Sequence, residues 1–480
     1  MVRAAAGSAK ATKGHLASRS VGVRLSEVMG ASLRLEASAY ALEARLAVSE
    51  LEACPHPLKA LRGETGMCQA AHNGTRFPRV YVGEANGVPF LSSSDIIGLR
   101  PERGNYLSRK HTPKLDLLTI EPWMVLVSRS GTIGNVSLAS PRMAGWALSE
   151  HAIRIIAPDR DTAGYVAAFL RSSWGRDQIR GLTYGSVIQH IEPEHLRRIL
   201  IPDVPAIRRI AIGRAFVDAA LKRDEANHKL DEADALLCAS LKLPPLPVPA
   251  KGTVVSTVHA SDWGKRLDAA FHNPTARWVE EQLRAGGFEV LALGDPRLTN
   301  AINGVTKFRK RVYVEKGGIP LLSSKQLFQV DPIDVKRLAR GAHEDDLDEI
   351  CLEENMIAIT RSGTIGRVQI VPNYMQGWAN SEHTIRAIAA DDEQAGYLYA
   401  WLASDYGQTL IARYSYGSVI VEIDRHMVGD IRVPVLPSAE RKAIATLVLD
   451  ANRLRDEAWT LEQEALKSLC REIGGSAKNT

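Results

Sequence analysis

The chain repeats itself over a long period. Residues 129–157, RSGTIGNVSLASPRMAGWALSEHAIRIIA, return at 361–389 as RSGTIGRVQIVPNYMQGWANSEHTIRAIA, a shift of 232 positions with 18 of 29 residues identical. A repeat of this length predicts one chain with two similar domains, which could recognise two similar but non-identical partners. The same shift relates further short segments: RLEAS at 34–38 to RLDAA at 266–270, and TYGSVI at 183–188 to SYGSVI at 415–420.

Each repeat divides into a mixed part and a helical part. In the mixed part, short apolar runs such as WMVLVSRS alternate with Gly, Pro, Asn and Ser clusters, a pattern typical of strands joined by loops and helices. The other part has almost no Gly or Pro and is rich in Ala, Leu, Arg, Lys and Glu, which indicates a long helix. The expected organisation is a disordered basic tail at 1–20, mixed domains at 21–205 and 253–437, helices at 206–243 and 438–473, a Pro-rich linker at 244–252 and a tail at 474–480.

The helical parts carry apolar residues at heptad spacing. A 3–4 alternation of this kind produces a narrow apolar seam that suits another helix. We therefore expect an α+β fold in which the two helices pair as an antiparallel coiled-coil spacer, related by a pseudo-two-fold axis. The alternative is that each helix packs only on its own domain, and Arg223 interrupts the first seam. The first row comprises Ile212, Ala219, Ala226 and Ala233 with Ile444, Ala451, Ala458 and Ala465; the second comprises Phe216, Leu230 and Leu237 with Leu447, Leu454 and Leu461.

Composition excludes some classes of function. No apolar run approaches the roughly 18 residues that span a bilayer, so a membrane role is not expected. Five widely spaced cysteines without a C-x-x-C pair argue against a disulfide framework and a zinc site, and suit the cytoplasm. The net charge is +5, but residues 1–20 hold four basic residues and no acid, leaving only +1 for the rest of the chain. Any contact with nucleic acid must therefore come from local patches.

Two repeated glycine loops are candidates for contact with a phosphate backbone. In RSGTIG the paired glycines permit positive φ, and the arginine and hydroxyl side chains suit phosphate oxygens. The YGS segment is a second glycine loop with an aromatic residue. The alternatives are plain tight turns and, for the arginine, an internal salt bridge. The candidates are Arg129, Ser130, Thr132, Tyr184 and Ser186 in the first repeat and Arg361, Ser362, Thr364, Tyr416 and Ser418 in the second.

Basic residues cluster near the start of each mixed domain. In the second repeat they stand beside Phe308 and Tyr313, a combination that indicates a nucleic-acid patch, although a solvated surface loop would look the same. The candidates are Arg76 and Arg79 in the first repeat and Lys307, Arg309, Lys310 and Arg311 in the second.

The sequence offers no catalytic residue and no metal ligand. SEH at 149–151 and 381–383 contains residues used in catalysis, but neighbours in a strand point to opposite faces and cannot converge on one reacting atom. The chain has no G-x-x-x-x-G-K-[ST] phosphate loop and no amino-methyltransferase signature. We therefore expect a non-catalytic protein without a cofactor of its own.

The order of these motifs resembles the specificity subunit of type I restriction-modification systems over about residues 21–473. The matching segments are RLEAS and RLDAA, VPFLSSSDI at 88–96 with IPLLSSKQL at 319–327, the two RSGTIG and YGSVI motifs, and IPDVP and VPVLP before each helix. The N-terminal tail and the Ala-rich seam depart from the family pattern.

The resemblance implies two target-recognition domains that read a bipartite sequence in double-stranded DNA. It also implies docking of two methyltransferase subunits, which bring S-adenosylmethionine, and of restriction/translocase subunits, which use ATP and Mg.

Residues shared by both repeats cannot distinguish two different half-sites. Base readout should therefore lie where the repeats diverge within matched loops, and Arg and Asn have the donor and acceptor geometry for guanine and adenine edges. The candidates are Ser94, Asp95, Asn135, Gln189 and His190 in the first repeat and Lys325, Gln326, Arg367, Val421 and Glu422 in the second.

Other classes of function remain open from the sequence. The nearest is a DNA-recognition subunit of another methylation or phage-defence complex. An enzyme with two SEH-centred sites is more distant. A purely helical scaffold would not explain why the loops diverge while the frame is preserved.

Overall fold

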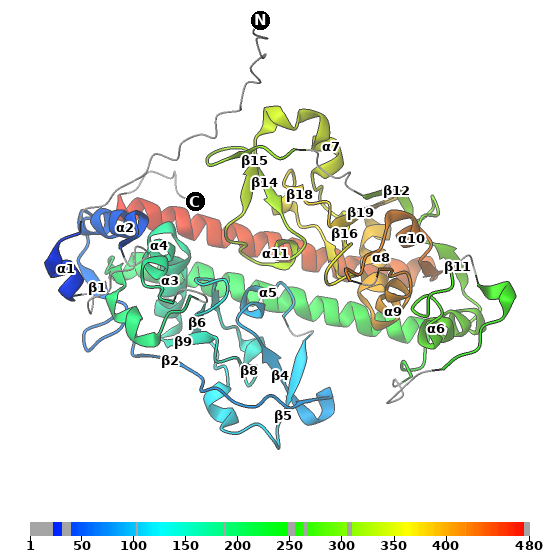
Figure 1. Cartoon of the computed structure of the whole chain (residues 1–480), viewed down its shortest axis with the longest axis horizontal. Coiled ribbons are helices and arrows are strands. Elements are labelled where there is room, and N and C mark those ends of the chain that lie inside the picture. The colour runs from blue at the N-terminus through cyan, green and yellow to red at the C-terminus, as the bar shows by residue number, and fades with distance from the viewer. Residues whose placement is uncertain are drawn as a thin grey trace, which may run out of the picture.

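Two long helices run side by side through the whole molecule in the computed structural model (Figure 1). The structure describes residues 23–30, 40–101, 104–185, 189–247, 255–263, 266–304, 310–417 and 419–474. The tail expected at 1–20 and most of the tail at 474–480 lie outside this part of the chain. Helix α5 spans Ala206–Leu241 and helix α11 spans Ser438–Ile473, each with 36 residues and hence about 54 Å long. Both lie within the ranges expected from the sequence.

The two helices are antiparallel, as predicted. Lys222 Nζ lies 2.5 Å from Glu457 Oε2, and Lys229 Nζ lies 3.4 Å from Asp450 Oδ2. Moving seven residues forward on α5 therefore moves the partner seven residues back on α11. The predicted seam is buried: Ile212, Ala219, Ala226 and Ala233 on α5 face Ile444, Ala451, Ala458 and Ala465 on α11, none more than 4% exposed. Alanine along this row lets the helix axes approach closely.

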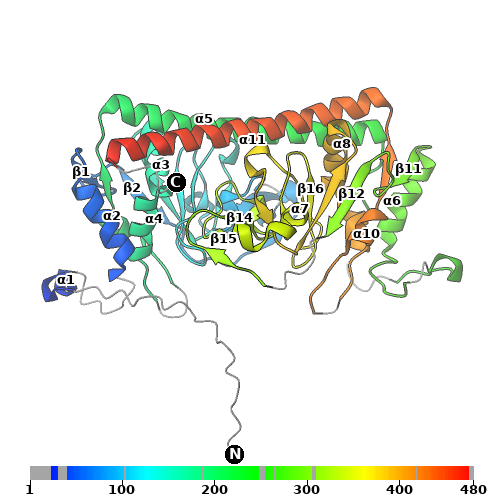
Figure 2. The ribbon, with the colours of Figure 1, turned by 90° about the horizontal axis from the view of Figure 1, so that it is seen from above.

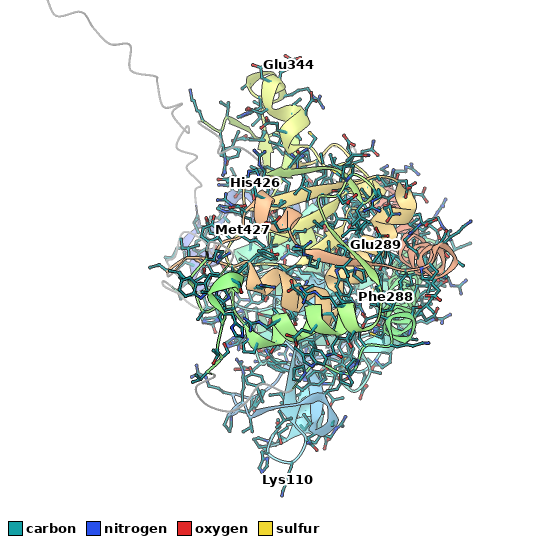
Figure 3. All side chains as sticks on the ribbon, turned by 90° about the vertical axis from the view of Figure 1, so that its right-hand side faces the viewer. Lys110, Phe288, Glu289, Glu344, His426 and Met427 are labelled. Carbon is teal, nitrogen blue, oxygen red and sulfur yellow. The ribbon has the colours of Figure 1, made fainter. Side chains whose placement is uncertain are left out.

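A pseudo-two-fold axis relates the two halves of the molecule. On α5, Asp224 accepts a hydrogen bond from the backbone N–H of Arg142 at 2.9 Å. Asp456 of α11 accepts one from the N–H of Tyr374, also at 2.9 Å. Both residues of the second pair stand 232 positions after their counterparts. Figure 3 shows Lys110 of the first half and Glu344 of the second at opposite edges of the molecule, as such an axis requires.

The described residues of the first mixed domain form three small sheets. The central four-stranded sheet has the order β2-β9-β6-β7, the second has the order β3-β5-β4-β8, and β1 pairs with β10. Their bounds are β1 Leu58–Ala60, β2 Ala70–Asn73, β3 Tyr81–Val82, β4 Gly87–Leu91, β5 Asn105–Ser108, β6 Val125–Ser128, β7 Val136–Leu138, β8 Ala147–Leu148, β9 Ala152–Ile156 and β10 Leu200–Pro202.

The second mixed domain repeats this topology strand for strand. Its sheets have the orders β12-β19-β16-β17, β13-β15-β14-β18 and β11-β20. Figure 1 shows β4 and β5 on one side of the helix pair and β14 and β15 on the other. The bounds are β11 Glu289–Ala292, β12 Thr299–Gly304, β13 Tyr313–Val314, β14 Ile319–Leu322, β15 Lys336–Leu338, β16 Ile357–Thr360, β17 Val368–Ile370, β18 Ala379–Asn380, β19 Thr384–Ala389 and β20 Arg432–Val435.

Short helices connect each sheet to the long helices. Helix α3 begins after Asp159, whose carboxylate accepts from the N–H of Thr162 at 2.8 Å, and α8 begins after Asp391, which accepts from the N–H of Gln394 at 2.7 Å. The bounds are α1 Leu25–Gly30, α2 Leu42–Glu52, α3 Arg160–Arg171, α4 Ser173–Gly181, α6 Pro274–Ala285, α7 Leu347–Ile350, α8 Asp392–Ala403, α9 Asp405–Arg413 and α10 Arg425–Gly429. In Figure 3, His426 and Met427 of α10 and Phe288 and Glu289, where α6 leads into β11, lie on the end of the second domain that faces the viewer.

Gly213, the one glycine within α5, permits close packing against α3. A Cβ atom added at Gly213 would lie 1.8 Å from the carbonyl oxygen of Asp161, and one added at Gly164 would lie 2.1 Å from the carbonyl oxygen of Gly213. At the equivalent contact in the second domain only one of the two helices has a glycine, because Gly396 of α8 faces Ala445 of α11. Each long helix therefore packs on its own domain as well as on the other long helix.

Each long helix also completes the core of the other domain. The first half of α5 enters the core of the first domain through Phe216 and Val217, and its second half enters the core of the second domain through Leu230 and Leu237. The end of α11 returns to the first core through Ala465, Leu466, Leu469, Cys470 and Ile473. The predicted helix pair is thus confirmed, and the alternative that each helix packs only on its own domain is wrong.

This sharing predicts that Leu237→Ala destabilises the second domain rather than the first. Leu237 is fully buried in the second core, so truncation should cost about 2–5 kcal/mol. Hydrogen exchange should show lost amide protection in α6, whose Ala276, Val279 and Leu283 belong to that core. Leu221→Ala on the same helix is the control, because Leu221 is 40% exposed. Equal effects of the two substitutions would contradict the shared core.

Candidate nucleic-acid interface

Three of the repeated motifs meet at one end of the central sheet in each domain. The N–H of Arg129, just after β6, donates to the carbonyl oxygen of His151 at 2.9 Å, and the N–H of Ile191 donates to that of Arg129 at 3.0 Å. The second domain repeats both bonds at 2.8 and 3.0 Å. We call these groups the motif clusters: Arg129, Ser130, Glu150, His151, Tyr184, His190 and Glu192 in the first domain, and Arg361, Ser362, Glu382, His383, Tyr416 and Glu422 in the second.

The RSGTIG loop is a tight turn closed by a hydroxyl group. Ser128 Oγ donates to the carbonyl oxygen of Thr132 at 2.6 Å and accepts from the N–H of Asn135 at 2.9 Å. Thr360 Oγ1 makes the same two bonds in the second domain, at 2.6 and 2.9 Å. Gly131 has φ of 75° and Gly363 of 80°, so both require the left-handed backbone that favours glycine. Thr132 and Thr364 are exposed at the tip of this turn.

The serine of each RSG motif bonds the histidine of the SEH motif. Ser130 Oγ lies 2.8 Å from His151 Nδ1, and Ser362 Oγ lies 2.7 Å from His383 Nδ1. The expectation that SEH lies in a strand is wrong, because residues 149–151 form a turn between β8 and β9. His151 Nε2 then faces Glu150 Oε1 at 3.5 Å, and the corresponding distance in the second domain is 3.9 Å. The residues form a hydrogen-bonded network that fixes the histidine ring.

Each motif arginine forms an ion pair with a glutamate of its own domain. Arg129 is paired with Glu192, and its Nε donates to the carbonyl oxygen of Ile191 at 3.1 Å; its side chain is 15% exposed. Arg361 Nη2 lies 3.2 Å from Glu422 Oε2. As placed, these arginines join the motif segments to one another, so a contact with a phosphate backbone is not their first role. The geometry favours the internal salt bridge, which the sequence left open as the alternative to a phosphate contact.

The acid that pairs with each arginine differs between the domains. Glu192 has Asp424 as its counterpart in the repeat, whereas Glu422 is the counterpart of His190. In the first domain Tyr184 Oη also donates to Glu192 at 2.6 Å, which raises the pKa of Tyr184. Glu422 was singled out from the sequence as a candidate for base readout, whereas Glu192 was not. The only sequence signal for them was divergence directly after a shared YGSVI motif.

Arg79 and Arg311 pair with the glutamate of each SEH turn. Arg79 Nη2 lies 3.1 Å from Glu150 Oε2, and Arg311 pairs with Glu382. Burial tends to raise the pKa of Glu150, but its backbone hydrogen bond and the bond and charge of Arg79 outweigh burial and lower it. Arg76 and Lys310 are exposed. The remaining candidates Ser186, Ser418, Lys307 and Arg309 lie outside the described residues.

Several divergent residues chosen for base readout have structural roles. Asp95 Oδ2 accepts from the N–H of Ser92 at 2.8 Å, and Gln326 Oε1 accepts from the N–H of Ser323 at 3.0 Å, so two different side chains close the same turn. Ser94 Oγ bonds Ser92 Oγ at 2.9 Å. Asn135 is 3% exposed, so its amide cannot reach a base edge from this position. Asn135 is thus corrected from a reading residue to a buried one.

A cleft of about 710 Å³ lies between the two domains. Ser94 and Asp95 line it from the first domain, and Lys325 and Arg367 line it from the second. The Arg367 guanidinium stacks on the ring of Phe328, with Cζ 3.9 Å from the centroid. The structure therefore brings these four candidates together, near the middle of the molecule rather than on the outer part of each domain.

The described residues of the segment between α9 and α10, which carries the second YGSVI motif, lie away from the helix pair. Figure 2 shows both long helices along one side of the molecule, and the segment between α9 and α10 hanging from the opposite side. Gln189 is exposed in the first domain, and Tyr416 and Val421 are 36% and 40% exposed in the second. His190 is half-buried, held by two backbone bonds to Tyr184. Among the described candidates for base readout, Gln189, Lys325, Arg367 and Val421 are exposed.

Within the described ranges, no group of three or more His, Cys, Asp or Glu residues is placed to hold a metal ion. None of the helices in the same ranges combines the length and apolar character that a membrane crossing needs.

Comparison with known proteins gives structural likeness only. No family model matches the chain, and no curated protein does. Its fold is similar to the type I restriction-modification S subunit from M. genitalium (16% identity, 86% of this chain and 98% of that chain, TM-score 0.28). It is also similar to the HsdS subunit from Thermoanaerobacter tengcongensis (13%, 87% and 96%, 0.27). A third similar chain comes from a structure described for complex assembly and conformational transition of the type I R-M system (14%, 87% and 98%, 0.27).

The Arg79–Glu150 pair predicts a pH effect. Because the pKa of Glu150 is lowered from its usual value near 4.5, its stabilising contribution is complete above that value and is lost as the pH falls through the folded pKa. Arg79→Gln should raise the pKa of Glu150 and cost about 1 kcal/mol or less, since the Arg79 side chain is 36% exposed. Carbon-13 NMR titration of labelled glutamate measures the shift. Arg76→Gln, at an exposed position nearby in sequence, should leave it unchanged; an unchanged Glu150 titration in Arg79→Gln would refute the pairing.

Proposed function

We propose that the chain is the DNA-recognition subunit of a type I restriction-modification complex, in which each mixed domain reads one half of a bipartite target. The observation that carries this proposal is the pseudo-two-fold relation between two copies of one domain, joined by an antiparallel helix pair. A DNA duplex has two-fold axes of its own perpendicular to its length. Two domains related by such an axis can therefore dock on two segments of one duplex in inverted orientation.

The distribution of shared and divergent residues supports this proposal. The shared arginines of the motif clusters are bound within each domain and preserve a common frame. Exposed positions beside that frame differ, for example Gln189 in the first domain and Val421 in the second. Two half-sites of different sequence require two domains with the same fold and different reading surfaces.

The helix pair supports a role in assembly. Apolar side chains on α5 are left uncovered, with Ile207 77%, Ile210 36% and Leu221 40% exposed. A pseudo-two-fold axis also offers two related positions to a partner, which fits two methyltransferase subunits. In this proposal the methyltransferases bring S-adenosylmethionine, the restriction/translocase subunits bring ATP and Mg, and the chain itself performs no chemistry.

Co-purification and genome-wide mapping of modified bases test the proposal. The chain, co-expressed with its neighbouring gene products, should copurify with a methyltransferase, and the modified sites should share two short sequences at a fixed separation. A modified sequence with a single continuous recognition element would contradict two-domain reading. Nuclease activity of the purified chain that His151→Gln and His383→Gln abolish would favour the enzyme alternative.

Lys310→Gln should weaken binding to all DNA sequences alike. Lys310 is exposed and, unlike Lys316, belongs to the basic cluster at 307–311, so we expect it to contact phosphate. Removing one such contact makes the slope of log K against log salt shallower by about 0.9. Affinity measured across a salt series, with a cognate and a scrambled duplex, gives this slope. Lys316→Gln, at an exposed lysine of the same segment, is the control. A loss confined to the cognate duplex would contradict the phosphate assignment.

A further inference from the structure

A cluster of charges joins the two domains directly, in addition to the helix pair. Arg171 at the end of α3 donates from Nε to Asp331 Oδ2 of the second domain at 2.9 Å, and its Nη1 lies 2.7 Å from Glu462 Oε1 of α11. Arg176 of α4 also pairs with Asp331. Arg223 of α5, which interrupts the heptad seam, reaches both oxygens of Glu462 at 2.6 Å. We call these five residues the interdomain latch.

A backbone contact lies beside the latch. The N–H of Leu99 donates to the carbonyl oxygen of Phe328 at 2.9 Å, and the N–H of Val330 donates to that of Ile97 at 2.8 Å. The contact pairs Gly98 with Gln329, which are equivalent positions of the two repeats. It therefore lies close to the pseudo-two-fold axis. Two antiparallel hydrogen bonds alone would be a weak link between domains, and Asp331 directly follows one of the donors.

Four of the five latch residues are not part of the duplicated frame, the exception being Arg223, whose counterpart is Arg455. The repeat places Ala403 at the position of Arg171, Gln408 at that of Arg176 and Leu230 at that of Glu462. The loop that contains Asp331 aligns with the first repeat at a shift of 231 positions, so the counterpart of Asp331 is Arg100. The link between the domains is therefore one-sided and does not follow from the fold of either copy.

Burial makes the latch a strong constraint. The side chains of Arg171 and Glu462 are 4% and 3% exposed, and that of Asp331 is 16% exposed. Burial tends to raise the pKa of both acids, but the facing arginines outweigh it and hold the pKa of each below its usual range. Removing one member of such a network leaves a buried charge without a full complement of partners, so opening it is costly.

We propose that the interdomain latch fixes the separation and relative rotation of the two recognition domains, and that Asp331 is thereby a positioning residue for half-site spacing. The helix pair fixes where each domain is attached, and the latch removes the remaining freedom of each domain to rock about its attachment. A duplex bound to both domains must then present its half-sites at one separation. This inference rests on the proposed function.

Hydrogen exchange of the free chain tests the latch without DNA. Asp331→Asn should speed exchange in peptides that contain the Leu99 and Val330 amides by about tenfold or more, because local opening no longer breaks a complete ion network. The matched control is Asp334→Asn. Asp334 pairs with Arg180 across the same boundary at 2.6 Å, but its side chain is 67% exposed and its loss should have little effect. Should Asp331→Asn fail to fold, Arg176→Gln removes one arm of the network at a side chain that is 25% exposed.

Mapping of modified sites tests the effect on spacing. Complexes with Asp331→Asn should also modify sites whose halves are one base pair closer or farther apart, while the half-site sequences stay the same. Unchanged exchange at Leu99 and Val330 would overturn the latch. Faster exchange with an unchanged spacing would overturn its role in specificity. If the wild-type complex modified no bipartite site, the proposed function would fail together with the spacing role, whereas the exchange result would still report the latch.

Discussion

Close antiparallel packing of α5 against α11 is the interaction on which the rest of the structure depends. Alanine at three of the four seam positions on each helix removes the side-chain bulk that would keep the axes apart. Because the helices are 36 residues long, each passes its own domain and reaches the other one. The antiparallel direction then places two copies of the same domain on opposite sides of one axis, and the inverted arrangement of their surfaces follows.

Because the long helices are shared between the cores, the two domains are not independent of each other. A rigid spacer that only holds two independent domains apart would leave each core complete by itself. Here residues of α5 fill the second core and residues of α11 fill the first, and the latch joins the domains a second time. Movement of one recognition domain is therefore coupled to the helices and to the other domain, which suits a protein that must present two surfaces at a fixed separation.

Much of the fold could be predicted from the sequence, because its main signals are periodic. The 232-residue shift predicted two like domains, and the heptad rows predicted the paired helices. The motif clusters could be predicted only as separate segments, since RSG, SEH and YGS lie 20 to 60 residues apart and nothing in their spacing shows that they meet.

The roles of single residues were harder to predict for a physical reason. Whether Arg129 is free for phosphate depends on Glu192, whose counterpart Asp424 instead caps α10, while Arg361 pairs with Glu422. Asp95 and Gln326 differ in chemistry yet close the same turn, so divergence between the repeats did not mark a reading surface there. The latch was invisible in the repeat because it is one-sided.

Hydroxyl-radical footprinting of the complex on a duplex that carries its modified sequence tests the central claim most directly. Two domains related by a pseudo-two-fold axis predict two protected segments with an unprotected stretch between them, both on one face of the duplex. A single continuous protected segment, or protection of only one half, would contradict recognition by two copies held in inverted orientation.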